Sequence, residues 1–249
     1  MEMIVKQTRE VGTSAGVLLP RSWLNKQVVV TLLKPSTEEI IRDVIDILLK
    51  ERLNSEVKGI YLYGSYARGD YDPNSDIDIL VLTTKSNKLI RSGNYELLIV
   101  SEDNFSKNLN ENLNYLALLR EVETLLNREL IENYKSKKIK FNSRKHLLEI
   151  GSVVKINKGT VEICGSNRKQ VPDGVVYSIV LRLRELSLLK DIISHKSYSK
   201  NDFSKLVGEK AYSAYLRVKR NEKELNNLSA EEINPILNIS EKWLKELKE

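Results

Sequence analysis

The feature of this sequence that most constrains its fold is a glycine-serine pair followed by two closely spaced aspartates. Gly64-Ser65 comes directly after the apolar run Val57–Tyr63, and Asp76 and Asp78 flank the start of a second run, Ile77–Thr83. Runs rich in β-branched and aromatic residues, separated by turn-forming residues, are typical of strands. Successive side chains of a strand point to opposite faces, so Asp76 and Asp78 are expected to share one surface while Ile77 faces a core. The sequence therefore predicts two strands joined by a tight turn, with two carboxylates on one surface.

The same residues predict a site for a metal-bound nucleoside triphosphate. Two carboxylates a few ångströms apart repel each other unless one is protonated or a cation lies between them, and Mg²⁺ prefers hard oxygen ligands. Gly64 permits a tight turn whose backbone N–H groups can approach an anion, and the Ser65 hydroxyl adds a donor. Arg68 can contribute positive charge nearby. Asp70 and Asp72 are interpreted instead as turn residues around Pro73-Asn74.

These motifs resemble the nucleotidyltransferase superfamily of the DNA polymerase beta type, and most closely its minimal nucleotidyltransferase branch. The residues that carry the resemblance are Gly64-Ser65-Tyr66-Ala67-Arg68-Gly69 and Ser75-Asp76-Ile77-Asp78, separated by a short spacer. The resemblance covers residues 37–140. It implies an α+β core with a mixed sheet and flanking helices. It also implies a third carboxylate on the strand after the aspartate pair, for which Glu96 in the run Tyr95–Val100 is the candidate.

The resemblance implies an enzyme that transfers a nucleoside monophosphate. Two Mg²⁺ ions are expected, one shared by Asp76, Asp78 and Glu96, where it lowers the pKa of an acceptor hydroxyl, and one held by Asp76 and Asp78, where it neutralises the triphosphate. The acceptor attacks the α-phosphorus and pyrophosphate leaves. The simplest product is an adenylated acceptor made from ATP. The sequence leaves open whether the acceptor is a protein, an RNA or a small molecule.

Residues 1–34 form a separate segment that predicts short strands at Met3–Thr8, Val17–Leu19 and Val28–Leu33. So short a segment cannot bury enough surface to fold alone, which favours pairing with a second copy as a homodimer. Glu10 to Leu24 resembles the AbrB/SpoVT-like swapped-hairpin DNA-binding family, whose members fold as interleaved dimers. If the segment binds DNA, the phosphate-contacting cations are expected to be Lys6, Arg9 and Arg21. The alternatives are a dimerisation module without nucleic acid, or a DNA-binding regulator or antitoxin-like protein in which the transferase fold is accessory or inactive.

The rest of the chain predicts a nucleotidyltransferase domain over residues 37–171 and an α-helical domain over residues 173–249. Ser36 and Glu39 form a capping box before an amphipathic helix that is expected to run from Thr37 to Leu53. Asp103–Lys137 is expected to be largely helical. Val153–Ile156 and Thr160–Cys164 are expected to form a hairpin over residues 153–164. Apolar residues at helical spacing predict a helix after Pro172, and Ser229 with Glu232 predicts the start of the last one.

Composition excludes several classes of protein. Apolar residues make up 41% of the 249 residues and charged residues 30%, which excludes a mostly disordered chain. No run is long and apolar enough for a membrane helix, and no secretory signal is readable, so a cytoplasmic protein is expected. The single cysteine, Cys164, excludes an internal disulfide. The formal charge of +6 favours anionic partners. The basic residues of the last segment suit RNA or a polyanionic acceptor, or are simply solvated helix faces.

Overall fold

The structure is a computed structural model that describes residues 4, 6, 8–30, 35–72, 75–139, 141–194, 196 and 198–248. The chain divides into two compact units, Met1–Lys34 and Pro35–Glu249. None of the helices in the described residues is long and apolar enough to cross a membrane. Pro73-Asn74 lies outside the described residues, as do Met3 and Thr31 to Leu33 of the predicted strands.

The first unit contains a two-stranded antiparallel hairpin, β1 (Arg9–Val11) and β2 (Ser14–Gly16), turned at Gly12. A strand was expected at Val17–Leu19, and that expectation is wrong: the tight turn at Gly12 pairs Arg9 with Gly16, so the ladder ends before Val17. Residues 28–30 form no strand either, since no described strand pairs with them. No residue of this unit is buried in its described part.

The second unit is built on a five-stranded mixed sheet, in which only β4 and β6 run parallel. Its strand order is β5-β6-β4-β3-β7. The strands are β3 (Val57–Tyr63), β4 (Ile77–Thr83), β5 (Lys88–Ser92), β6 (Tyr95–Ser101) and β7 (Glu123–Leu126). The three central strands lie where the apolar runs predicted them. The edge strands β5 and β7 were not predicted, and β7 interrupts the segment that was expected to be largely helical.

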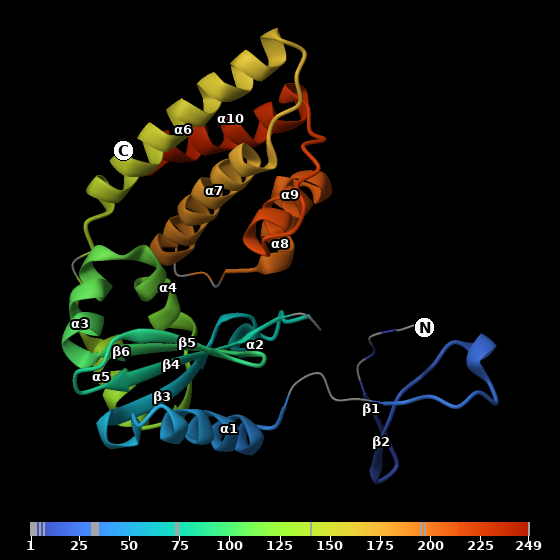
Figure 1. Ribbon diagram of the computed structural model, residues 1–249, viewed down its shortest axis with the longest axis vertical. Helices are drawn as coiled ribbons and strands as arrows, with labels where there is room; N and C mark the ends of the chain where they lie inside the picture. The colour runs from blue at the N-terminus through green and yellow to red at the C-terminus, as the bar shows by residue number, and fades with distance from the viewer. Residues whose placement is uncertain are drawn as a thin grey trace. The chain divides into compact units, whose positions relative to one another are not determined.

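Helices cover both faces of this sheet (Figure 1). They are α1 (Thr37–Lys50), α3 (Glu102–Glu111), α4 (Leu113–Glu121) and α5 (Arg128–Ser136). Alternate residues of β4 enter two cores: Ile77, Ile79 and Val81 pack with α1, whereas Leu80 and Leu82 pack with α3, α4 and α5. The predicted capping box of Ser36 and Glu39 starts α1, which ends at Lys50 rather than at Leu53. The mixed α+β architecture predicted from the sequence is confirmed.

The remaining helices pack on one another above one end of the sheet, as Figure 1 shows. They are α6 (Ser143–Ser166), α7 (Asp173–Ile193), α8 (Lys200–Val207), α9 (Glu209–Lys219) and α10 (Ala230–Glu246). The six apolar residues that predicted α7 are all buried: Val176, Ile179, Val180, Leu183, Leu186 and Leu189. The predicted capping box of Ser229 and Glu232 starts α10. We call α6 to α10 the helical layer.

The hairpin expected over residues 153–164 is wrong, because this segment is the second half of α6. Leu147, Ile150, Val154 and Val161 recur at helical spacing and are buried against α7 and α10. Gly159, which was expected to make the turn, lies inside the helix with open space around it. The β-branched residues of this segment favour a strand locally, but the packing of its buried apolar residues against α7 and α10 stabilises the helix.

Candidate functional site

The turn after β3 carries Gly64 and Ser65 into a short helix, α2 (Gly64–Arg68). Gly64 has a backbone φ of 73°, which lies in the left-handed region that favours glycine. A Cβ atom on Gly64 would lie 2.1 Å from Oδ2 of Asp78, so a side chain has no room there. The turn and the carboxylate of Asp78 are therefore in direct contact. Ser65 lies in the same turn, and its carbonyl oxygen accepts a hydrogen bond from the Asp70 amide.

The three predicted carboxylates come together at the start of β4 and β6. Asp78 and Glu96 are register partners in the parallel pair of these strands, and Asp76 is exposed one residue before β4 begins. Asp78 has the same parity as Leu80, so it lies on the sheet face that α3, α4 and α5 cover further along the strand. Glu96 also accepts a hydrogen bond of 2.7 Å from Nε of Arg91 on β5.

Electrostatics shows that these carboxylates act on one another. Burial, Glu96 and, to a smaller degree, Asp76 raise the pKa of Asp78 to about 7, whereas Lys219 and Arg68 act in the opposite direction. An aspartate ordinarily titrates near 4, so the two cations do not offset the effects of burial and of the neighbouring carboxylates on the pKa of Asp78. Perturbation of this kind is common at functional sites.

Arg68 lies at the end of α2 and is held by two acidic side chains. Its Nη1 is 2.6 Å from Oε2 of Glu121, and its Nη2 is 3.2 Å from Oδ1 of Asp70. Its guanidinium also lies 5.4 Å from the ring centroid of Tyr198, within the range of a cation–π contact. Two acidic side chains of the site, Glu121 and Asp70, therefore already pair with the positive charge of Arg68.

Three further charged residues of this site come from distant parts of the chain, and the sequence reasoning did not assign them to it. Glu121, at the end of α4, accepts a hydrogen bond of 3.1 Å from the Gly64 amide. Arg184 on α7 lies 5.5 Å from the Tyr198 ring centroid. Lys219 ends α9. No local motif marks these residues, because only the packing of the helices brings them to the turn.

Lys219 is the cation of the helical layer that interacts with all three carboxylates. Displacement of water by neighbouring atoms, together with Arg184, lowers the pKa of the Lys219 ammonium, and Asp78, Asp76 and Glu96 act in the opposite direction. The residue as a whole remains exposed to solvent. Lys219 is therefore a solvent-exposed cation whose charge acts on the three carboxylates.

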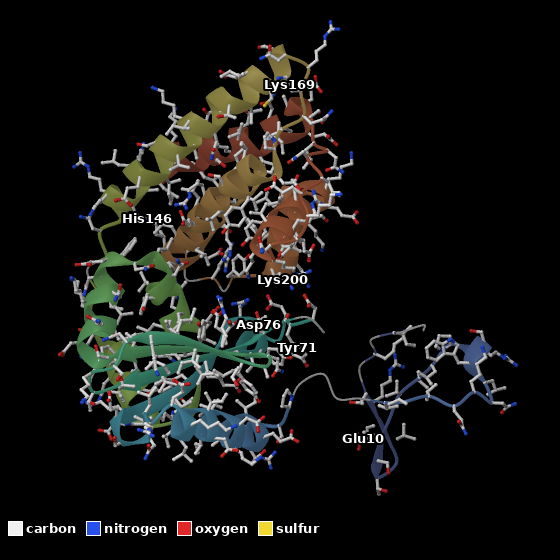
Figure 2. The ribbon with its side chains drawn as sticks, in the orientation of Figure 1. Glu10, Tyr71, Asp76, His146, Lys169 and Lys200 are labelled. Carbon is white, nitrogen blue, oxygen red and sulfur yellow. The ribbon has the colours of Figure 1, made fainter. Side chains whose placement is uncertain are left out.

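The loop between α2 and β4 is tied to the start of α8. The Lys200 amide donates to Oδ2 of Asp70 over 3.3 Å, and Nζ of Lys200 lies 2.8 Å from Oδ2 of Asp72. Figure 2 shows Asp76 and Tyr71 at the end of the sheet nearest the helical layer, with Lys200 across from them. Asp70 and Asp72, interpreted from the sequence as turn residues, thus also join the core to the helical layer.

A cavity of about 350 Å³ lies beside α2. It is lined by Arg68 and Glu121 from the core and by Leu188, Asp191 and Tyr198 from the other side, among others. Its volume lies within the usual range for a small-molecule pocket. Two of these residues, Arg68 and Glu121, also belong to the site around the Gly64 turn.

The carboxylates fit a hard divalent cation in their chemistry. Among the described residues no group of three or more His, Cys, Asp or Glu side chains forms a cage that could hold a metal ion. Mg²⁺ does not need such a cage, because it usually keeps several waters and is held by one or two carboxylates together with substrate phosphates. Burial is the main cause of the raised pKa of Asp78, and Glu96 and Asp76 add a smaller repulsion that a cation would act against. Asp76, Asp78 and Glu96 supply the kind of oxygen ligand that such an ion prefers.

Comparison with known proteins identifies relatives of the core. Residues 41–150 match the family model described as a nucleotidyltransferase domain. Two curated proteins of Methanocaldococcus jannaschii, both named protein adenylyltransferases by inference, are 47% identical over 45 and 47 residues, which is 18% of this chain. The matches span 44% and 43% of the relatives, less than half of their length.

Two solved structures show a wider but weaker likeness. A spectinomycin adenyltransferase from Enterococcus faecialis, solved with ATP and spectinomycin, is 15% identical with a TM-score of 0.43, over 86% of this chain and all of its own. A nucleotidyltransferase-like protein from Exiguobacterium sibiricum is 16% identical with a TM-score of 0.34, over 83% of this chain and 75% of its own. Residues 41–150, which contain the glycine turn and the aspartate pair, thus match a nucleotidyltransferase domain.

Proposed function

We propose that this protein transfers a nucleoside monophosphate, AMP from ATP in the simplest case, to an acceptor hydroxyl and releases pyrophosphate. The observation that carries the proposal is the contact between the Gly64 turn and Asp78, with Glu96 beside Asp78 and Lys219 facing both carboxylates. The adenylyl group is favoured by the names of the two curated relatives. Those names also favour a protein hydroxyl over an RNA or a small molecule as the acceptor.

Each residue of the site has a distinct part in the proposed reaction. Asp76, Asp78 and Glu96 would hold the divalent cations, which neutralise the triphosphate and make the acceptor hydroxyl more acidic. Gly64 lets the backbone approach the phosphates, with the Ser65 hydroxyl as a further donor. Lys219 supplies positive charge from the side of the helical layer. The acceptor oxygen bonds to the α-phosphorus, the bond from that phosphorus to the bridging oxygen breaks, and the hydroxyl proton passes to a carboxylate or to water.

Transfer of label from ATP would test this proposal. Purified protein incubated with Mg²⁺ and α-labelled ATP should label an acceptor in a cell extract, and label from γ-labelled ATP should not be transferred. Asp76→Asn and Asp78→Asn should each reduce labelling at least about a hundredfold, in the range found when groups that stabilise a transition state are removed. Mass spectrometry of the labelled fraction would identify both the base and the acceptor. Labelling that persists in the double variant would disprove the assignment.

We also propose that the first unit dimerises, on the evidence of its exposed apolar side chains. Leu24, Val29 and Val30 are exposed to 72%, 93% and 68% of their surface. An isolated two-stranded hairpin is marginal in water, so burying these residues against a second copy would supply the missing core. Light scattering on the full chain should report a dimer, and Leu24→Asp with Val29→Asp should shift it to the monomer mass.

Lys6, Arg9 and Arg21 remain predicted DNA contacts, which salt-dependent retention on DNA would test.

A further inference from the structure

Glu121 is the last residue of α4, and both of its carboxylate oxygens bind the turn. Oε1 accepts from the Gly64 amide over 3.1 Å and Oε2 from Nη1 of Arg68 over 2.6 Å. The side chains of Glu121 and Arg68 are only 21% and 16% exposed. Glu121 therefore bridges the two ends of α2 from another helix.

Both donors are ones that the turn would offer to a phosphate. A backbone N–H has a single proton, so the Gly64 amide can make one strong hydrogen bond at a time. A carboxylate oxygen and a phosphate oxygen are equivalent acceptors for such donors. The other side of Arg68 is already taken, since Asp70 lies 3.2 Å from its Nη2. A phosphate that approaches this turn therefore meets donors that Glu121 occupies.

The charge of Glu121 also opposes a triphosphate. Burial raises the pKa of the Tyr63 phenol, and Asp78, Glu96 and Glu121 add to this effect, so the three carboxylates lie in one electrostatic neighbourhood. Cations held by the predicted metal ligands would offset Asp78 and Glu96. Arg68 offsets Glu121 only while the two remain paired.

Glu121 has space into which it can move. It lines the cavity of about 350 Å³ beside α2, together with Arg68. Val122 leads directly into β7, so the backbone at Glu121 is held while its side chain remains rotatable. A change of rotamer would free the Gly64 amide without moving α4.

We propose that Glu121 is an internal competitor of the nucleotide, which holds the phosphate turn in the free protein and is displaced when a triphosphate binds. This inference rests on the proposed function. It makes Glu121 a positioning residue that sets nucleotide affinity, and it predicts that removing its charge tightens binding. A purely structural role predicts the opposite sign, because an unsupported turn would bind less well.

Calorimetric titration of the full-length protein tests the proposal. Glu121→Gln should bind ATP with Mg²⁺ about tenfold more tightly than the wild type, a difference of about 1.4 kcal/mol. Inorganic tripolyphosphate with Mg²⁺ should show the same gain, and adenosine should show none. Glu121→Asp keeps the charge but is one methylene too short to bridge both donors, so it should show part of the gain. Glu129→Gln on α5, whose carboxylate is exposed and has no described partner, is the matched control and should leave affinity unchanged.

The outcomes separate this inference from the proposed function. If the wild type binds triphosphate and Glu121→Gln binds it equally or more weakly, the inference is overturned and the proposed function still stands. Binding that appears only in Glu121→Gln supports both. Absence of triphosphate binding in both proteins overturns both. A gain with adenosine as large as that with tripolyphosphate also overturns the inference, because the competition would not be at the phosphates.

Discussion

Gly64 and Asp78 lie so close that a single methyl group on Gly64 would be 2.1 Å from the Asp78 carboxylate. The contact joins the turn after β3 to the first residues of β4, two strands that pair Tyr63 directly with Asp78. Strand pairing therefore fixes the position of this carboxylate relative to the Gly64 backbone amide at the start of α2. Any change that widens the contact separates the predicted phosphate turn from the predicted metal ligand.

Gly64→Ala should abolish most activity while leaving the protein folded. The new Cβ would strain a backbone with φ of 73° and would displace the Asp78 carboxylate. Strain of this kind costs about 1–3 kcal/mol. Gly69→Ala is the matched control, because Gly69 has φ of 78° but nothing within 4 Å of its Cβ position. Urea unfolding should show that both variants remain folded, with the larger loss of stability in Gly64→Ala because of its clash with Asp78. Transfer assays should show the loss of activity in Gly64→Ala alone. Equal activity in the two variants would contradict a role for the contact.

Asp78→Asn should stabilise the metal-free protein at pH 8. The folded-state pKa of Asp78, about 7, lies above its ordinary value of 3.8, so the folded protein binds the proton more tightly than the unfolded chain does. The charged carboxylate therefore costs stability that is absent near pH 4 and grows as the pH rises to about 7. Urea unfolding in EDTA should show the variant more stable by up to about 4 kcal/mol at pH 8 and close to the wild type near pH 4.

The control for this experiment is Asp46→Asn, at an exposed position on α1. It should change stability by less than about 0.5 kcal/mol at either pH. Added Mg²⁺ should stabilise wild type more than Asp78→Asn, since a cation relieves the repulsion only when the carboxylate is present. A wild-type protein as stable as Asp78→Asn at pH 8 in EDTA would show that Asp78 carries no such penalty.

Asp173 should contribute stability that depends on pH in the opposite sense. It is fully buried at the start of α7, where Oδ2 accepts from Nε of Arg217 over 2.8 Å and from the Leu225 amide over 3.0 Å. Burial acts to raise the pKa of Asp173, but Arg217 and these amides hold it below 3.8. Its stabilisation is therefore complete above pH 4 and is lost as the pH falls through the lower folded-state pKa.

Asp173→Asn should accordingly destabilise the protein by about 3 kcal/mol at pH 7, because it leaves Arg217 without its counter-ion. Urea unfolding at pH 7 and pH 3 should show the difference shrinking at the lower pH. Asp202→Asn, at an exposed position of α8, should cost about 0.5 kcal/mol. A difference that is the same at both pH values would mean that the Asp173 charge contributes nothing.

The centre of the sheet could be predicted from the sequence because its signals are local. Val57–Tyr63 and Ile77–Thr83 are apolar runs of strand length, and the structure has β3 and β4 with those bounds. The alternation of Asp76, Ile77 and Asp78 predicted one acidic side and one buried side, and Ile77 is fully buried. Placing Glu96 beside Asp78 required only that the next predicted strand, Tyr95–Val100, pair with β4 in register.

The rest of the site could not be predicted, because it depends on contacts between distant segments. Glu121 and Lys219 reach the turn only through the packing of α4 and α9, and neither lies in a motif. Edge strand β7 has a single strand partner and only four residues, too few to show a period. In α6 the β-branched residues on both sides of Gly159 suggested a hairpin. The buried residues of the whole segment, however, recur at helical spacing.

Lys219→Met should weaken binding of ATP with Mg²⁺ by about tenfold, the opposite of the effect expected for Glu121→Gln. The ammonium of Lys219 interacts with Asp78, Asp76 and Glu96 from the end of α9, so its loss removes positive charge from the place where a triphosphate would bind. It should also raise the pKa of Asp78 further, because Lys219 is the first of the cations that lower it. Calorimetric titration at pH 7.5 would measure both variants beside Lys205→Met, whose exposed side chain on α8 has no described partner. Equal affinity in the Lys219 and Lys205 variants would show that the helical layer does not contribute charge to the site. If Lys219→Met weakens binding and Glu121→Gln tightens it, both residues act on the charge of the phosphates.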